Sequence, residues 1–301
     1  MADLHIFKDF EGTLIEYEPM AKHTYYRLGG PARYFFKPLR QEDLQKIIER
    51  CLNNNVEFIF LGKGANVLFS DKGFDGLVLN LEDCCSGFER KGEKSTDIHC
   101  GAGAVLFKIV LEAEKLGLAG LEMLSGIPGT VGGALRMNAG AFGAEIGDVV
   151  NSVDVLDPIT LKAMRLFKNS IDFGYRSAPL LENKLIVSAT IRLQPSEPAL
   201  LGRKRREILE ARKAKQPLDL PSCGSVFKRP VGDYAGRLIE AAGCKGLKSG
   251  HAWVSEKHAN FIVHDGKGTS KDVFDLIAQV KHRVETAFGV VLEPEVQLIG
   301  F

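Results

Sequence analysis

The sequence lacks several features that would assign it to a class at once. Its 39 basic and 38 acidic residues leave a formal net charge of +1, so no strong field draws the chain to nucleic acid or acidic lipid. No apolar run reaches the roughly 18 residues of a membrane-spanning helix. The first ten residues lack the basic start and apolar core of a secretory signal. We therefore expect a cytoplasmic protein with no nucleic-acid partner and no membrane span.

The cysteines lack the spacing of a metal or disulfide framework. None of the six belongs to a C-x-x-C pair, and they are scattered at Cys51, Cys84, Cys85, Cys100, Cys223 and Cys244. In a chain of 301 residues such cysteines are typical of reduced thiols. We expect neither a disulfide framework nor a metal site.

Hydrophobic periodicity predicts an α+β chain in three parts, 1–80, 81–200 and 201–301. Apolar residues at helical spacing predict helices over 44–52, 106–113, 233–242 and 273–288. Short apolar runs predict strands at 58–61, 77–79, 149–156, 163–167, 185–193, 261–263 and 290–301. The last of these strands would contain Glu293 and Glu295. A further helix, 201–215, is rich in Arg and Lys and is interpreted either as a solvated linker or as a wall that faces phosphate.

The most informative segment runs from Ser125 to Gly143. Six of its nineteen residues are glycine, and hardly any is charged. Glycine is expected at such density where the backbone bends unusually or approaches a ligand closely, and its free N–H groups can form a nest for phosphate. The alternative is a buried turn of small residues between packed elements. A second glycine-bearing loop, 62–66, follows the strand predicted at 58–61, and together the loops favour a dinucleotide site.

The two best-known nucleotide signatures are absent. The pattern G-x-G-x-x-G fails because Val67 follows Gly62 and Gly64, and because Leu106 follows Gly101 and Gly103. The P-loop pattern G-x-x-x-x-G-K-[ST] does not occur either. Loops from two different domains would suit an extended FAD that lies across a domain seam.

The sequence resembles the UDP-N-acetylenolpyruvoylglucosamine reductase family, and the resemblance spans nearly the whole chain. Its blocks keep the family's order. They are 25–32 (YYRLGGPA), 61–68 (LGKGANVL), 125–134 (SGIPGTVGGA), 137–140 (MNAG), 175–177 (YRS), 224–230 (GSVFKRP), 255–261 (SEKHANF) and 292–300 (LEPEVQLIG). The resemblance implies an FAD-binding fold of the vanillyl-alcohol-oxidase (PCMH) type in two subdomains, followed by a C-terminal α+β substrate-binding domain. The compact segment between Arg176 and Pro221 is similar to the shorter, type II subgroup.

The reaction implied by this resemblance belongs to peptidoglycan precursor synthesis. In the family, NADPH reduces a non-covalently bound FAD and leaves. Hydride then passes from the flavin to the β-carbon of UDP-N-acetylglucosamine enolpyruvate, which yields UDP-N-acetylmuramate. The resemblance thus implies small-molecule partners, a role in cell-wall biogenesis, cell shape, the cell cycle and cell division, and, we expect, a monomer.

Three residues are expected to carry the chemistry that follows hydride transfer. A guanidinium forks onto a carboxylate, so Arg176 would stabilise the charge that builds up on the enolpyruvyl carboxylate. Ser225 would donate the proton to the α-carbon. Glu295 would have to be protonated beside that charge, which burial favours. Residue chemistry alone leaves Glu293 and Glu295 open, and the family pattern selects Glu295.

Further residues are assigned from the matching blocks. Those expected to bind FAD are Arg27, Gly62, Lys63, Gly64, Ala65, Asn66, Val67, Ser125, Gly126, Ile127, Pro128, Gly129, Thr130, Gly133, Asn138, Gly140 and Gly143. Those expected to bind substrate are Lys228, Arg229, His258 and Asn260. The chain departs from the family at Ala65, a frequent Ser, at Arg229, a frequent Asn, and at His251 and Trp253, where smaller or amide residues are expected.

Two other functions remain open from the residues. The same flavin fold could serve an oxidase that uses O₂, although such enzymes often tether FAD through His or Cys and neither glycine-bearing loop contains one. A nucleotide sensor that lost its chemistry is the non-enzymatic alternative. Retention of Arg176, Ser225 and Glu295 together argues against it.

Overall fold

The computed structural model describes residues 4–301, so the first three residues of the expected non-secretory start lie outside the described part. Its contacts group the chain into two compact units. Unit 1 runs up to Glu16 and includes Tyr34–Lys63 and Gly76–Glu210, whereas unit 2 comprises Tyr17–Arg33, Gly64–Asp75 and Ala211–Phe301. The expected boundaries at residues 80 and 200 stay a prediction. Short 3-10 helices cover Leu4–Phe7, Met20–Lys22, Gln41–Asp43, Glu122–Leu124 and Lys168–Ser170.

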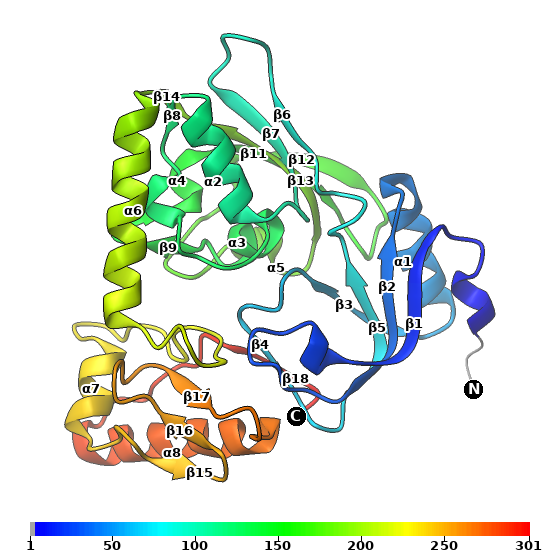
Figure 1. The fold of residues 1–301 in the computed structure, drawn as a ribbon. Helices are drawn as coiled ribbons and strands as arrows, with labels where there is room; N and C mark the ends of the chain where they lie inside the picture. Colours follow the sequence, from blue (N-terminus) through cyan, green and yellow to red (C-terminus); the bar gives the residue numbers. More distant parts are fainter. Residues whose placement is uncertain (1–3) are drawn as a thin grey trace. The chain divides into compact units, whose positions relative to one another are not determined.

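The first sheet has the strand order β1-β2-β5-β3 (Figure 1). Its strands are β1 (Gly12–Pro19), β2 (Pro31–Pro38), β5 (Phe74–Asn80) and β3 (Glu57–Leu61). Strands β3 and β5 are parallel and pair Phe58 with Leu77. Helix α1 (Leu44–Asn53) packs against β3 and buries Leu44, Ile47 and Cys51. The predicted helix and both predicted strands of this region are confirmed.

The second sheet, in unit 1, is wholly antiparallel, with the order β12-β11-β13-β7-β6. Its strands are β12 (Ala163–Phe167), β11 (Val150–Leu156), β13 (Leu185–Arg192), β7 (Asp97–Gly101) and β6 (Phe88–Arg90). Two small ladders pair β8 (Leu118–Ala119) with β14 (Gln194–Pro195), and β9 (Gly140–Ala141) with β10 (Ala144–Glu145). The helices of this region are α2 (Leu106–Lys115), α3 (Val131–Arg136), α4 (Ile146–Val149) and α5 (Pro179–Glu182). Helix α3 contacts β13 and β7, so the glycine-rich segment is held against this sheet.

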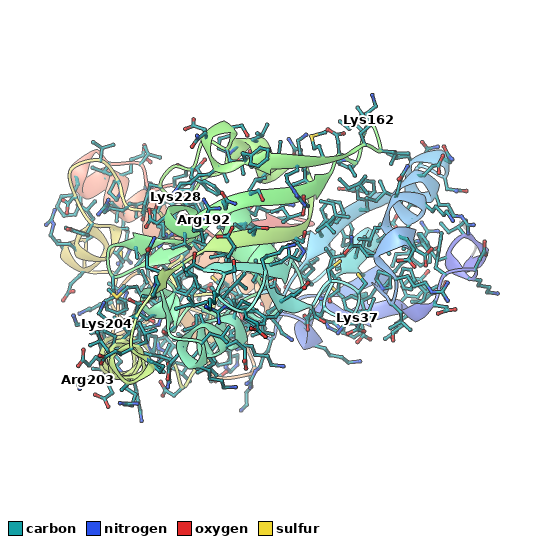
Figure 2. The ribbon with its side chains drawn as sticks, turned by 90° about the horizontal axis from the view of Figure 1, so that it is seen from above. Lys37, Lys162, Arg192, Arg203, Lys204 and Lys228 are labelled. Carbon is teal, nitrogen blue, oxygen red and sulfur yellow. The ribbon has the colours of Figure 1, made fainter. Side chains whose placement is uncertain are left out.

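The basic helix is α6 (Pro198–Lys215), and the chain passes from unit 1 to unit 2 within it. Arg205 donates to Glu114 of α2, with an Nε–Oε2 distance of 2.6 Å, and Lys204 pairs with Glu122 at 3.2 Å. Figure 2 labels Arg203 and Lys204 on this helix and Arg192 on β13. Because Lys204 and Arg205 are paired with acidic residues within the protein, the structure favours the linker interpretation.

Unit 2 contains a three-stranded antiparallel sheet, β15-β16-β17, with α7 and α8. The strands are β15 (Lys248–Ser249), β16 (Ala252–Val254) and β17 (Ile262–His264), and the helices are α7 (Ala235–Ala241) and α8 (Ser270–Phe288). Thr269 and Asp272 form a capping box at the start of α8, and Gly289 ends it in the left-handed conformation. Helix α7 begins two residues after the predicted start, because the backbone of Tyr234, its N-cap, is extended.

One predicted strand is wrong in most of its length. Instead of 290–301, only β18 (Gln297–Ile299) is a strand, and it pairs in parallel with β4 (Val67–Phe69). Glu293 and Glu295 precede it. Pro294, which has no N–H to give to a ladder, forms only an isolated bridge with Phe227.

Two further observations concern the described residues as a set. None of the helices within residues 4–301 is long and apolar enough to cross a membrane. In the same part of the chain, no three His, Cys, Asp or Glu side chains are grouped so that they could hold a metal ion. All six cysteines have free thiols, and five of them are buried.

Candidate functional site

The two glycine-bearing loops meet inside unit 1, at Gly62 and Thr130. A Cβ added to Gly62 would lie 2.4 Å from the Thr130 Oγ1, which is closer than a side chain tolerates. Thr130 caps α3, because its hydroxyl accepts the Gly133 N–H at 3.3 Å. The Asn80 amide holds Gly62 from the other side by donating to its carbonyl at 3.1 Å. Only glycine fits at position 62, and the loops share one junction.

Several glycines of the second loop have no packing reason to be glycine. A Cβ on Gly133 would meet only the Thr130 Oγ1, at 3.6 Å, and one on Gly129 or Gly143 would meet nothing within 4 Å. Gly129 and Gly143 have positive φ, but Gly133 lies in a helix, where alanine is normally preferred. Open space above a helical glycine is what a phosphate cradle requires. These residues therefore fit the diphosphate of FAD.

A pocket of about 440 Å³ borders this junction. Lys63, Glu82, Val105 and Lys108 contribute to its lining, and Val105 bridges to Thr130. The Lys63 ammonium is paired with the Glu82 carboxylate, so its charge is partly used within the protein. The volume lies in the range of small-molecule sites, roughly 300–1,000 Å³. The sequence analysis does not predict that Asn80 and Glu82 contact the first loop. Their polar side chains closely follow the strand predicted at 77–79, and this position could have indicated such a role.

The end of the second loop is tied to the turn that carries Arg176. The Asn138 side chain is buried, and its amide donates to the Gly174 carbonyl at 2.8 Å while its oxygen accepts the Gly147 N–H at 3.0 Å. Arg176 in turn donates from Nη2 to the Gly140 carbonyl at 2.7 Å. Asn138, expected to contact FAD, thus serves the backbone, and it connects the flavin loop to the predicted catalytic arginine.

Arg176 lies in a turn rather than on a strand. Gly174 and Ser177 form an isolated bridge, and between them Arg176 has a φ of 51°. Asn138 at 40° and Arg27 at 54° are also left-handed. Non-glycine residues occupy this region at an energetic cost, and such strain concentrates at functional sites. The sequence predicts these three as site residues, whereas it does not predict the other left-handed residues, Tyr17, Asn55, Phe142 and Leu161.

The remaining first-loop residues belong to unit 2. Gly64 has a φ of 62°, and a Cβ there would lie 2.1 Å from the His23 carbonyl oxygen. Its own carbonyl accepts the Tyr25 N–H at 3.0 Å, which fixes the loop to the segment that carries the exposed Arg27. Ala65 and Asn66 follow as turn residues, and Val67 begins β4. In unit 1, the turn from Ser125 through Gly126, Ile127 and Pro128 joins a 3-10 helix to α3.

Ser225 and Glu295 lie on neighbouring segments of unit 2. The Glu295 N–H donates to the Val226 carbonyl at 2.7 Å, and Asn66 donates from Nδ2 to the Glu295 carbonyl at 2.9 Å. Both predicted catalytic side chains are half-buried. The structure therefore brings together the two segments that carry the predicted proton donor and the predicted carboxyl group.

The surroundings separate Glu295 from Glu293. Glu293 is exposed and pairs with Lys228, another predicted substrate residue. Glu295 is half-buried close to the Cys223 thiol: burial raises the pKa of Cys223 to about 12, and the charge of Glu295 adds to this rise. The two carboxyl groups therefore differ in exposure, and Glu295 is the more enclosed of the two.

The other predicted substrate residues differ in availability. The Arg229 guanidinium lies 5.8 Å from the centre of the Tyr234 ring and is exposed. Burial lowers the pKa of His258, whose Nδ1 accepts the Asn260 N–H at 3.3 Å. The Asn260 side chain is buried and bonded to the backbone of Phe227.

The two other departures from the family have local partners. The His251 Nδ1 lies 3.0 Å from Asp265, and Trp253 pairs with Lys248 and Val263 within the β15-β16-β17 sheet. Neither contact involves a predicted site residue. A buried group that the sequence analysis missed is Tyr26, whose hydroxyl lies in the core of unit 2 near Cys223, and burial raises its pKa.

Comparison with known proteins agrees with the geometry. Residues 32–159 match the family of FAD binding domains, and residues 216–299 match the family described as UDP-N-acetylenolpyruvoylglucosamine reductase, C-terminal domain. These matches confirm the expected α+β FAD-binding fold with a C-terminal domain, and FAD as the cofactor.

Whole-chain relatives extend the agreement. The UDP-N-acetylenolpyruvoylglucosamine reductase of Lachnoclostridium phytofermentans is 42% identical, over 94% of this chain and 92% of the relative. That of Caldanaerobacter subterraneus is 43% identical, over 96% of this chain and 95% of its own length. The crystal structure of the Thermus caldophilus UDP-N-acetylenolpyruvylglucosamine reductase, 31% identical, superposes with a TM-score of 0.80 and covers 96% of this chain and 99% of that one. The chain therefore belongs to the UDP-N-acetylenolpyruvoylglucosamine reductase family.

Proposed function

We propose that this chain is an FAD-dependent oxidoreductase that reduces UDP-N-acetylglucosamine enolpyruvate to UDP-N-acetylmuramate with NADPH as the hydride donor. When bound, FAD would supply the chemistry of hydride transfer from NADPH to the β-carbon of the enolpyruvyl group. The product is a peptidoglycan precursor. We further propose a cytoplasmic monomer without nucleic-acid partners, which serves cell-wall biogenesis and, through it, cell shape, the cell cycle and division.

One observation carries the FAD part of this proposal, namely the Gly62–Thr130 junction with open space above Gly133. The backbone N–H groups at the start of α3 and in the turn before it would hold the diphosphate. Asn80 and Thr130 would keep that backbone in place through their hydrogen bonds to Gly62 and Gly133. Lys63 would add positive charge within the first loop. Arg27 would add it from the segment that is bonded to Gly64.

Arg176 would stabilise the negative charge that develops on the substrate carboxylate. The Gly140 carbonyl and the Asn138 amide fix the turn on which it lies, so little reorganisation is needed when charge develops. A half-buried Glu295, kept protonated, would share a hydrogen bond with the same carboxylate instead of repelling it.

Ser225 would deliver the proton that completes the reduction. A serine hydroxyl is a weak acid, so it protonates only a strongly basic centre, such as the α-carbon after hydride addition. Ser225 is next to Val226, and the Val226 carbonyl accepts the Glu295 N–H. The proposed proton donor and the Glu295 carboxyl group therefore lie on adjoining segments. Lys228, Arg229 and His258 would supply cations and donors for the diphosphate of the substrate.

The experiment that tests this function follows the flavin spectrum of purified protein under anaerobic conditions. We expect a yellow protein whose FAD is released by acid, which bleaches with NADPH and recolours when the enolpyruvyl substrate is added. Recolouring by air but not by that substrate would indicate the oxidase alternative. Protein that takes up no FAD would contradict both enzymatic functions.

A further inference from the structure

The Asn260 side chain is committed to the chain segment that follows Ser225. It is only 7% exposed. Its Oδ1 accepts the Phe227 N–H at 3.0 Å, and its Nδ2 donates to the Phe227 carbonyl at 2.8 Å. The Asn260 carbonyl accepts the Val226 N–H at 2.8 Å. One residue therefore makes three hydrogen bonds to two consecutive residues, and both ends of its amide group are used.

These bonds replace a sheet ladder that the segment does not have. Val226 and Phe227 are buried, yet the segment has only the isolated bridge between Phe227 and Pro294. Pro294 has no N–H, so it cannot donate to Phe227. A buried backbone group without a partner costs about 1–3 kcal/mol. Asn260 supplies the two partners that a neighbouring strand would otherwise provide to Phe227.

The same segment fixes the backbone at Glu295. The Val226 carbonyl accepts the Glu295 N–H at 2.7 Å, and the Lys228 N–H donates to the Glu293 carbonyl at 2.9 Å. The chain of hydrogen bonds thus runs from Asn260 through Val226 to Glu295. Ser225 directly precedes Val226 and Phe227, the two residues that Asn260 holds. The position of the Ser225 backbone therefore depends on Asn260.

We propose that Asn260 is a positioning residue that fixes Ser225 relative to Glu295, and not the substrate contact that the sequence predicts. This inference rests on the proposed function. If it is correct, loss of the Asn260 amide displaces Ser225, the proton donor. The rate of FAD reduction and the affinity for substrate do not change. A displacement of about 1 Å at a reacting group can slow a step about 10²-fold.

The test uses Asn260→Asp and Asn260→Ala in the FAD-loaded enzyme, with three measurements. They are the rate of flavin bleaching by NADPH, the rate of recolouring by saturating enolpyruvyl substrate, and the Kd of that substrate for oxidised enzyme from the change in flavin absorbance. We expect recolouring to slow by about 10- to 100-fold in both variants. Bleaching and Kd should stay within about twofold of wild type. Asn260→Asp keeps the acceptor for the Phe227 N–H, so it decides the question if Asn260→Ala does not fold.

A fourth measurement needs no activity. Amide hydrogen exchange at Phe227, Val226 and Glu295 should be faster in Asn260→Ala than in wild type, because the Phe227 N–H has lost its acceptor and the segment has lost both side-chain bonds to residue 260. The control is Thr269→Ala, which removes the cap of α8 in the same unit at a cost of about 1 kcal/mol but touches none of these bonds. It should leave exchange at these three amides and the recolouring rate unchanged.

Two results would overturn the inference. A raised Kd with normal recolouring at saturation would make Asn260 a substrate contact, and unchanged recolouring despite faster exchange would remove its link to Ser225. Failure of the proposed function has a different signature, because wild-type enzyme itself would then not recolour with the enolpyruvyl substrate.

Discussion

At the scale of single residues, function depends on which side chains can contact a ligand and which are bonded to other parts of the protein. Lys63 and Lys228 are paired with acidic residues, and Asn138 is bonded to backbone. Ser225 and Glu295 are half-buried on adjoining segments. The sequence blocks that match the family identify the residues around a site. They do not distinguish a residue that contacts the ligand from one that positions another site residue.

Replacing the proton donor should affect one half-reaction. In Ser225→Ala we expect bleaching by NADPH at the wild-type rate and recolouring by the enolpyruvyl substrate slowed about 10²- to 10⁴-fold, because general acid catalysis contributes that much. Ser222→Ala, in the same segment, is the control and should behave as wild type in stopped-flow measurements. Equal slowing of both half-reactions in Ser225→Ala would refute the proton-donor role.

Replacing the predicted anion-binding arginine should separate charge from geometry. Arg176→Lys keeps the charge and the same non-glycine backbone, but it loses the fork that bonds a carboxylate twice. We expect kcat/KM for the enolpyruvyl substrate to fall about 10- to 100-fold, the equivalent of one charged hydrogen bond. Arg192→Lys, at a surface pair with Asp97, is the control in steady-state assays. If the two variants behaved alike, Arg176 would have no special function.

At the scale of elements, α3 offers a test in which stability and function move in opposite directions. Gly133 is helical and a Cβ has space there, so Gly133→Ala should raise the unfolding free energy of the FAD-free protein, by up to about 1 kcal/mol. The same methyl group would occupy the space we assign to phosphate, so FAD affinity should fall. Urea unfolding and flavin fluorescence titration measure the two effects. Unchanged FAD affinity would place the cofactor elsewhere.

Elements with a regular pattern were predictable from the sequence, whereas irregular ones were not. The spacing of Ile47 and Cys51 in α1, and of Val273 and Val280 in α8, gave helices that the structure confirms. The apolar residues on either side of Glu293 and Glu295 predict a strand over 290–301. Pro294 has no N–H to donate to a neighbouring strand, and only an isolated bridge to Phe227 forms there. The turn at Arg176 depends on contacts with Gly140, far away in sequence, and no local signal gives them.

At the scale of the whole molecule, ion pairs on the antiparallel sheet make stability depend on pH. Hydrogen bonds from Arg192 hold the pKa of Asp97 below its usual value. Burial alone would raise the pKa of Asp154, but bonds from Arg165 and Ser188 outweigh it and lower the pKa. A carboxylate whose pKa is lower in the folded protein stabilises it above the unfolded pKa, and that contribution is lost as the pH falls through the folded pKa.

The urea midpoint should therefore drop between about pH 5 and about pH 2. An Asp97→Asn, Asp154→Asn double variant should start lower and lose less over this interval, because two of the titrating groups are gone. Identical slopes for variant and wild type would mean that these two pairs do not contribute.

A single turnover by the enzyme itself shows directly whether it reduces the enolpyruvyl group. Purified protein is reduced anaerobically with one equivalent of NADPH per flavin, freed of nucleotide, mixed with UDP-N-acetylglucosamine enolpyruvate, and its products are identified by mass spectrometry. We expect one UDP-N-acetylmuramate per flavin, formed at the rate at which the yellow colour returns. Return of the colour without that product, or recovery of unchanged substrate beside reduced flavin, would contradict it.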